Sequence, residues 1–440
     1  MSFGSLFVGL LTLPGLLTAA TLNLRAGDTV LDAPLKIKSN TAVRGSPRGS
    51  RLLLKPGFSG SAAIVVEGVA NVTLAGFEIV GDRADMQSEW YLPTGEAAFA
   101  DFYPANGILI RESTGVTVRD VRISRVRTFP ILVNASGKVL VDQVRIEDSG
   151  TLNKTGRNNN TTGGILFEEG VNGFEVRNSS LTRIAGNAIW THSWARSPRQ
   201  RAGVVRNNTI TTVGRDAIQM GHATEVQVTG NTGGEIGFPT EWVDVENHGV
   251  GVALDTAGNV DKAVYADNHF TDVNGQCIDL DGFHDGEVIG NSCVNKRPLE
   301  AYPASHYGIV FGNNDPGMKP EKIVVRNNTV EGFGYGAVFL VGTGNTVEGN
   351  QFLNINRAHC GAEPITARCN YAVTEQPDLL RSGIYLANNG GRPAETSGNV
   401  IRGNTITGYG MATHCIGTAP GVKAADNTIA NNICTPSQDR

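Results

Sequence analysis

Short apolar segments of one form recur along the chain: a small residue, then usually Ile or Val, any residue, and a second apolar residue. They read GILI (107–110), PILV (130–133), GILF (164–167), AIWT (188–191), AIQM (217–220), GVAL (251–254), CIDL (277–280), GIVF (308–311), AVFL (337–340) and GIYL (383–386). Because successive strand residues face opposite ways, each segment predicts a short strand with one apolar face. No helical periodicity separates the segments, so the recurrence predicts a solenoid of stacked coils.

A second phrase alternates with these strands, and each copy contains an Asn two places before an inward-type residue. It reads VVRNNTI (204–210), VYADNHF (264–270), EVIGNSC (287–293), VVRNNTV (324–330), NTVEGNQF (345–352) and VIRGNTI (400–406). An Asn tolerates left-handed backbone, and its amide can bond the Asn of the coils above and below. We therefore expect one column made of Asn208, Asn268, Asn291, Asn328, Asn350, Asn404 and Asn427.

With these two phrases the chain resembles the right-handed parallel β-helix proteins of the pectin-lyase-like superfamily. The resemblance covers about residues 21–434. It implies an all-β, single-stranded right-handed parallel β-helix over residues 21–440, with a cap at about 21–60 and long loops walling one face. The superfamily includes polygalacturonases, pectate and alginate lyases, alginate epimerases, phage tailspikes and non-catalytic surface proteins.

Composition fits this architecture, because 55 Gly and only 18% charged residues are typical of a chain with many turns. The net charge of −5 argues against a nucleic-acid partner. Residues 1–20, MSFGSLFVGLLTLPGLLTAA, indicate a secretory signal that is cut after Ala20. We therefore expect a secreted, extracellular or periplasmic protein without a membrane anchor, monomeric, with a trimer left open.

Six cysteines also suit an exported protein. Cys360 and Cys369 could close a local loop, and Cys415 and Cys434 could fix the C-terminal end. Cys277 and Cys293 occupy inward strand positions, where either two buried thiols or a bridge would fit.

The outward positions of the repeated strands form two columns. The first column is Leu109, Leu132, Leu166, Trp190, Gln219, Ala253, Asp279, Val310, Phe339 and Tyr385. The second is Arg111, Asn134, Glu168, His192, Gly221, Asp255, Asp281, Gly312, Val341 and Ala387. Polar and acidic residues gather in the middle of both columns, whereas a merely solvated face would scatter them. The middle coils are therefore the predicted site.

Five insertions leave the repeat at the same point, just before the apolar segment. They span about 82–105, 150–162, 233–249, 296–306 and 356–382, and a smaller loop at 192–201 leaves on the other side. Stacked coils bring such loops together as a wall beside the outward columns. The wall carries Trp90, Tyr91, Phe99, Phe102, Tyr103, Trp194, Trp242, Tyr302, His306 and Tyr307. These rings either stack on sugars or pack their own loops.

The segment GQCIDLDGFHDG (275–286) concentrates the acidic residues. Neighbouring parallel strands lie ~4.8 Å apart, so Asp255 and Asp281, in one column, would stand at the separation of a retaining glycosidase. Asp255 and Asp279, on a diagonal, would stand in the inverting range. Of two crowded carboxylates one should keep its proton, which yields a general acid beside a base.

We accordingly predict a glycoside hydrolase in which Asp281 works with Asp255 or Asp279 on a polysaccharide or oligosaccharide. The predicted substrate-contact residues are Glu168, Trp190, His192, Trp194, Gln219, Trp242 and His284. This interpretation needs no metal and no cofactor. The polygalacturonase phrases NTD, DDC, GHG and RIK are absent, and GRDAI (214–218), with Asp216, is only loosely similar to the second.

Two alternatives remain open. A Ca²⁺-dependent lyase or C5-epimerase of uronic acid polymers would hold Ca²⁺ between Asp255, Asp279, Asp281 and Asp285. A non-catalytic adhesin or carbohydrate-binding surface would explain the aromatic wall but not the clustered carboxylates. Asp285, beside Gly286, could equally be a turn residue.

Overall fold

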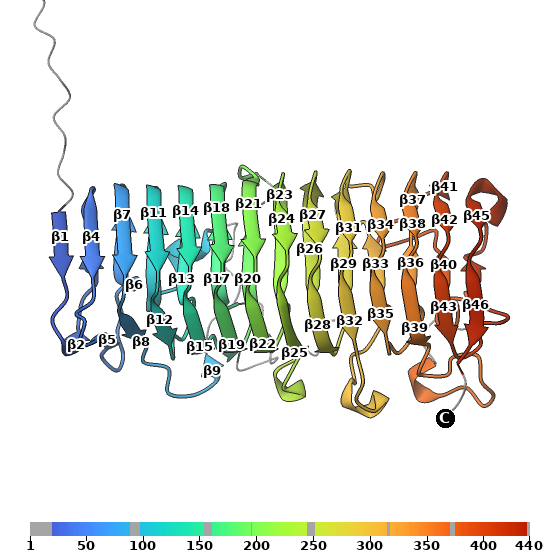
Figure 1. Ribbon diagram of the computed structural model, residues 1–440, viewed down its shortest axis with the longest axis horizontal. Coiled ribbons are helices and arrows are strands. Elements are labelled where there is room, and N and C mark those ends of the chain that lie inside the picture. The colour runs from blue at the N-terminus through green and yellow to red at the C-terminus, as the bar shows by residue number, and fades with distance from the viewer. Residues whose placement is uncertain are drawn as a thin grey trace, which may run out of the picture.

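The computed structural model describes residues 20–88, 97–153, 161–194, 196–243, 251–314, 317–369 and 375–437. Within these ranges the strands pair in parallel and build two long sheets, one of 28 strands and one of 14. Figure 1 shows the coils stacked side by side from β1 at one end to β45 and β46 at the other. The predicted all-β solenoid is therefore confirmed.

Successive coils place their strands in three rows. The first row, which carries the apolar segments, is β3 (Leu35–Lys36), β6 (Ala62–Glu67), β10 (Asn106–Arg111), β13 (Ile131–Asn134), β17 (Gly163–Glu168), β20 (Asn187–His192), β23 (Ile218–Thr224), β26 (Leu254–Asp261), β29 (Ile278–Asp281), β33 (Ile309–Gly312), β36 (Val338–Leu340), β40 (Ile384–Leu386) and β44 (Ile416–Thr418).

The second row completes the larger sheet. It is β1 (Ala20–Asn23), β4 (Thr41–Arg44), β7 (Ala70–Ala75), β11 (Thr114–Arg119), β14 (Gly137–Asp142), β18 (Asn172–Arg177), β21 (Gln200–Arg206), β24 (Gln227–Thr229), β27 (Val264–Ala266), β30 (Phe283–His284), β31 (Glu287–Ile289), β34 (Val324–Arg326), β38 (Thr346–Glu348), β42 (Val400–Arg402) and β45 (Thr428–Ala430). Of these, β30 pairs with the end of β26.

The third row forms the second sheet. It is β2 (Gly27–Leu31), β5 (Ser50–Leu54), β8 (Glu78–Val80), β12 (Arg122–Ser124), β15 (Arg145–Ser149), β19 (Ser180–Ile184), β22 (Thr209–Val213), β25 (Thr232–Ile236), β28 (His269–Val273), β32 (Ser292–Val294), β35 (Thr329–Glu331), β39 (Gln351–Ile355), β43 (Thr405–Gly408) and β46 (Ile433–Pro436). The strands β1–β5, inside the segment expected to be a cap, already belong to these rows.

Small elements complete the described structure. They are the strand pairs β9 (Gln87–Ser88) with β16 (Leu152–Asn153) and β37 (Gly342–Thr343) with β41 (Thr396–Ser397), the helix α1 (Phe99–Phe102), and the short helices η1 (Thr240–Trp242), η2 (Leu299–Ala301), η3 (Ala367–Cys369) and η4 (Ala424–Asp426). None of the helices in the described ranges has the length and apolar character needed to cross a membrane.

The core is a continuous stack of aliphatic side chains between the sheets. Pairing of the first-row strands puts the following residues in one line, each at most 1% exposed: Ile108, Ile131, Ile165, Ile189, Ile218, Leu254, Ile278, Ile309, Val338 and Ile384. Burying each such side chain contributes ~1.5–3 kcal/mol. The stack fixes the register, because a slip by one residue would turn the apolar face outward.

An asparagine ladder crosses the turn between the second and third rows, as the sequence predicted. Side-chain amides bond one to the next at 2.8–3.0 Å through Asn208, Asn231, Asn268, Asn291, Asn328, Asn350, Asn404 and Asn432. Two details of the prediction were wrong. Asn231 was missed, and Asn427 ends a different column in which it accepts a hydrogen bond from Asn399. The left-handed residues are those just before the ladder, such as Asn207 and Asn327.

All six cysteines are paired in disulfides. The bridges are Cys277–Cys293, Cys360–Cys369 and Cys415–Cys434. The choice left open for Cys277 and Cys293 is thereby decided in favour of a bridge, which ties β32 to the residue before β29 across the core.

The five long insertions join the third row of one coil to the first row of the next, as expected. They lie between β8 and β10, β15 and β17, β25 and β26, β32 and β33, and β39 and β40. In Figure 1 these connections project below the coils. Two further excursions, after β33 and after β40, leave toward the second row and form an opposite wall that the sequence did not indicate.

Candidate active site

The register of the central coils differs from the predicted one. Leu254 pairs with Ile218 on one side and with Ile278 on the other, and Asp255 lies opposite Gln219. Asp255 and Asp279 therefore share the first outward column, and the predicted pairing of Asp255 with Asp281 was wrong. The strand begins at Leu254, two residues later than the GVAL segment suggested.

A buried acid contacts the chain just before that strand. The backbone N–H of Val252 donates to Asp216 Oδ1 at 2.9 Å, and Arg215 Nε lies 3.3 Å from Asp216 Oδ2. Asp216 thus holds the chain just before β26. The sequence had offered Asp216 only as a loose likeness to a polygalacturonase phrase.

Polar side chains connect this anchor to the acidic column. Asn187 Nδ2 donates to Gln219 Oε1 at 3.0 Å, and Gln219 Nε2 donates to Asp255 Oδ2. Gln219 and Asp255 are only 6% and 7% exposed. Gln219, proposed as a sugar contact, instead orients a buried carboxyl group.

Burial and mutual repulsion keep protons on two of these acids. Burial, together with the carboxylates of Asp216 and Asp281, raises the pKa of Asp255 to about 8, although the Gln219 hydrogen bond opposes the rise. Burial also raises the pKa of Asp279 well above its ordinary value, assisted by Asp255, Asp281 and Asp216. This shift favours the protonated form of Asp279, which is the form that a proton donor needs.

Asp279 and Asp281 open into one cavity of about 430 Å³ on the first-row face. Its lining is Gln276, Asp279, Asp281, His306, Tyr307, Val310, Phe311, Gly312, Asn314, Phe339, Gln376, Leu379, Leu380, Asn389, Gly390 and Gly391. The residues come from the first-row strands and from both walls. Asp255 is not part of the lining, so of the three predicted catalytic acids two reach the cavity.

The two cavity acids have different environments. Both oxygens of Asp281 accept hydrogen bonds from Asn314, from its backbone N–H at 2.9 Å and from its side chain at 2.7 Å. This arrangement suits an ionised carboxylate, which only accepts. Asp279 Oδ1 is buried and has no hydrogen-bond partner. The two residues stand two positions apart on β29, or ~7 Å along a strand.

Aromatic side chains form the apolar part of the cavity. The ring centroids of His306 and Tyr307 lie 5.8 Å apart, and those of Tyr307 and Phe339 lie 5.9 Å apart. Tyr302 is fully buried and donates to Asp272 at 2.5 Å, so it supports its own loop. Trp90 and Tyr91 lie outside the described residues.

A different group of predicted contacts forms a second small core over the N-terminal half of the same face. Trp190, 6% exposed, packs edge-to-face on Phe99 with a centroid distance of 5.2 Å. Trp194 Nε1 donates to the Ala97 carbonyl at 3.0 Å. Both tryptophans thus pack against the loop that carries α1.

Glu168 fastens that loop to the sheet. Its carboxylate accepts the backbone N–H groups of Phe99 and Ala100, both at 2.8 Å, and Asn134 Nδ2 at 3.0 Å. Burial raises the pKa of Glu168 to about 7, although these hydrogen bonds oppose the rise. Glu168 is fully buried, so its position is that of a support for the loop.

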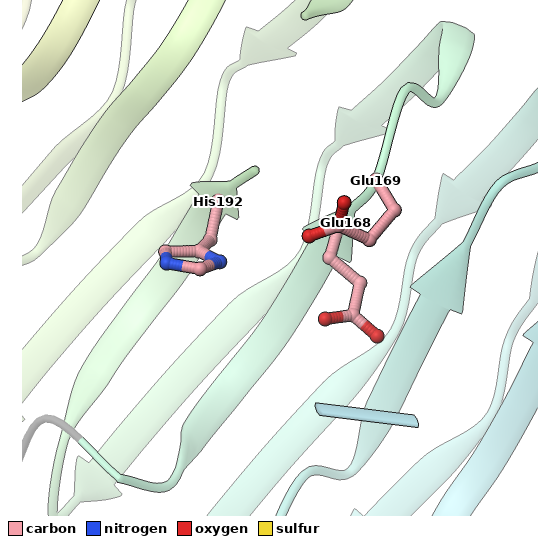
Figure 2. Close-up of side chains that lie close together, drawn as sticks. All are labelled: Glu168, Glu169 and His192. Atoms are coloured by element: carbon pink, nitrogen blue, oxygen red, sulfur yellow. The ribbon is translucent and has the colours of Figure 1, made fainter. Parts of the chain in front are cut away.

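Figure 2 shows the one metal-type cluster of the described residues, Glu168 with Glu169 and His192. Each offers one ligand atom within 4.8 Å of the others. The carboxylate of Glu168 is already occupied by three N–H donors. Burial lowers the pKa of His192 to about 4, so its ring is neutral. The acids Asp255, Asp279, Asp281 and Asp285 form no such cluster among the described residues.

The remaining predicted contacts lie away from the cavity. His284 bonds Asp285 at 2.8 Å and Asn259 at 3.0 Å on β30, at the turn toward the second row. Asp285 has a left-handed backbone, φ 48°, and Lys322 lies 3.4 Å from it, which agrees with a turn residue. Trp242 is half-buried in η1 and does not line the cavity.

The stacked parallel coils define the class of this protein, a parallel β-helix with an acidic cavity on one face. The family described as "Right handed beta helix region" matches residues 62–261 and 248–435, and the chain belongs to this family. The comparison with curated proteins gives no match.

Solved structures agree on the fold. A surface adhesin of Streptococcus pneumoniae, PfbA, is 17% identical with a TM-score of 0.57, over 77% of this chain and 85% of that one. The Dettilon tailspike protein is 15% identical with a TM-score of 0.55, over 75% and 60%. The catalytic unit of a GH87 α-1,3-glucanase from Streptomyces thermodiastaticus is 13% identical with a TM-score of 0.50, over 96% and 65%. The fold thus serves both glycoside hydrolases and adhesins.

Proposed function

We propose that this protein is a secreted glycoside hydrolase that uses Asp279 as general acid and Asp281 as general base. The observation that carries the proposal is that the two carboxyl groups line one cavity in different environments. Burial raises the pKa of Asp279 and so favours its protonated form, and Asn314 holds Asp281 by two N–H donors. Pairs of acids with such divergent environments are the usual basis of acid–base division of labour.

The reaction follows from these two states. Asp279 gives its proton to the glycosidic oxygen while the bond from that oxygen to the anomeric carbon breaks. Asp281 takes a proton from a water molecule whose oxygen bonds to the anomeric carbon from the other face. The ~7 Å of strand between the two residues leaves room for that water and corresponds to an inverting enzyme.

Asp255 acts on the reaction through Asp279. It lies beside Asp279 but outside the cavity, and its carboxylate, once ionised, raises the pKa of Asp279. We therefore regard Asp255 as a positioning residue that keeps the general acid protonated. The three disulfides and the apolar segment at residues 1–20 support export, because disulfides persist in oxidising compartments.

The test is a screen of the purified protein against neutral and uronic polysaccharides, with and without EDTA. New reducing ends and the absorbance of unsaturated uronates are followed together. We expect reducing ends without that absorbance and without an effect of EDTA. Absorbance that disappears with EDTA would establish a Ca²⁺-dependent lyase instead. Binding to a polymer without any cleavage would establish a carbohydrate-binding protein.

A further inference from the structure

Only a short part of the first outward column is accessible. Asp279, Val310 and Phe339 are partly exposed and line the cavity. On the N-terminal side Gln219 and Asp255 are buried, and on the C-terminal side Tyr385 is fully buried. The open part therefore extends over two strand spacings, ~10 Å, in place of a groove along the whole sheet.

Loops close both ends of this open part. On the N-terminal side the loop around Phe99 covers Trp190, and side chains fill the space up to Asp255. On the C-terminal side the Tyr385 hydroxyl donates to Gln376 at 2.8 Å, and Leu379 and Leu380 complete the end wall. A cavity bounded in this way holds the end of a sugar chain more readily than its middle.

The charges of the lining indicate which sugars fit. Among the described residues the acidic side chains of the lining are Asp279 and Asp281, of which Asp281 is held as a carboxylate, and the lining has no Lys or Arg. The basic side chain that lines it is His306, and the other polar groups are uncharged amides such as Gln276 and Gln376. Two arginines next to lining residues are engaged, since Arg381 bonds Asp378 at 2.7 Å and Arg392 Nε donates to the Asn314 carbonyl at 2.6 Å.

A carboxylated sugar would meet this lining unfavourably. Recognition of a carboxylate normally uses Arg or Lys, and juxtaposed like charges cost several kcal/mol. An uncharged sugar can instead lay its C–H face on Phe339 and bond its hydroxyls to the amides.

We propose that the cavity takes the end of an uncharged oligosaccharide and that the enzyme releases short products from chain ends. This inference rests on the proposed function for its exo action, whereas the preference for uncharged sugar concerns binding alone. The two parts are therefore tested separately.

Binding is measured by calorimetry with the Asp279→Asn variant, which lacks the acid but keeps the Asp281 carboxylate in the cavity. The neutral probes are tetrasaccharides of glucose with α-1,3, α-1,4, β-1,3 and β-1,4 linkages, and the acidic probe is tetragalacturonate. We expect at least one neutral probe to bind about tenfold more tightly than tetragalacturonate. Equal or tighter binding of tetragalacturonate would overturn the inference, and so would failure of all four neutral probes to bind.

A charge placed in the cavity sharpens the test. In the Asp279→Asn background, Gln376→Lys should raise the affinity for tetragalacturonate about tenfold, because it supplies the missing cation. The control Thr271→Lys adds the same charge on the exposed third-row strand β28 and should change nothing. An equal effect of both substitutions would show that general attraction, and not the cavity, governs binding.

Exo action is read from the wild-type protein on end-labelled neutral oligosaccharides of increasing length. We expect one short product from the first turnovers onward. An early ladder of internal fragments would overturn the chain-end assignment and leave the hydrolase standing. No cleavage together with selective binding of a neutral probe would refute the hydrolase and the exo action, while the binding preference stood.

Discussion

Asp255 and Asp279 occupy the same outward position on neighbouring strands, and only Asp279 opens into the cavity. Asp255 is buried behind Gln219, where burial keeps its pKa at about 8. The two carboxyl groups repel each other when both are charged, so ionisation of either one disfavours ionisation of the other. This relationship has consequences for both activity and stability.

The pH profile of the reaction should report this repulsion. Activity falls at high pH as Asp279 loses its proton, and Asp255→Asn removes one of the charges that raise the pKa of Asp279. We expect the basic limb of kcat/KM to move to lower pH by about one unit in this variant. Asp285→Asn, a matched change outside the cavity, should leave the limb in place. If the basic limb of kcat/KM stayed in place in Asp255→Asn, Asp255 would have no effect on the pKa of Asp279.

Stability should depend on pH with a defined sign. The pKa of Asp255 rises from an ordinary value of ~3.9 to about 8 in the folded protein. Between these values the folded state binds more protons, so the free energy of unfolding falls as pH rises through that window. Asp255→Asn should flatten this fall, by a few kcal/mol at most. The measurement is urea denaturation at about pH 5 and about pH 9. The prediction would be contradicted if the free energy of unfolding changed equally between these pH values in wild type and variant.

The repeat allowed much of the fold to be predicted, because coil stacking turns sequence period directly into spatial neighbours. Ile278 and Leu280 are core residues as expected, and the insertions do form one wall. The predicted register at Asp255 was wrong because the strand begins at Leu254, and the tertiary contact of Asp216 with Val252 before it leaves no local signal in the sequence. Asn314 and Gln376 were missed because the excursions that carry them have no repeat of their own.

In the N-terminal half of the same face, too, a contact between segments distant in sequence could not be predicted from the repeat. Glu168, His192 and Trp190 stand in the correct outward columns, but a loop distant in sequence covers them. An outward strand position predicts exposure only where no insertion folds back over it. The sequence could not show where the segment at 97–105 would pack.

Glu168→Ala tests the assignment of Glu168 to the loop. It leaves the N–H groups of Phe99 and Ala100 without their acceptor, which costs ~1–3 kcal/mol per buried group. We expect faster hydrogen exchange over residues 97–105 with hydrolysis retained, because Glu168 lies outside the cavity. Glu169→Ala removes the neighbouring carboxylate and serves as the control. Loss of hydrolysis with unchanged hydrogen exchange would show that Glu168 belongs to the active site and does not hold the loop.

The asparagine ladder should contribute to stability at each step. Asn291 donates to Asn328 at 3.0 Å and to the Tyr265 carbonyl at 2.8 Å, and it accepts from Asn268. Asn291→Ala leaves buried groups unpaired and should lower the free energy of unfolding by ~2–4 kcal/mol. Thr271→Ala, on the exposed face of β28, should change it by less than ~0.5 kcal/mol. Similar values for the two variants would mean that water replaces the ladder bonds.

The most direct test of the account compares wild type, Asp281→Asn and Asp285→Asn on the best substrate of the polysaccharide screen. Both variants remove one carboxylate from the same turn of chain, but only Asp281 lines the cavity. We predict that reducing-end release falls ~10²–10⁴-fold in Asp281→Asn and stays within about twofold of wild type in Asp285→Asn. Equal release by wild type and Asp281→Asn would contradict the carboxylate-pair mechanism.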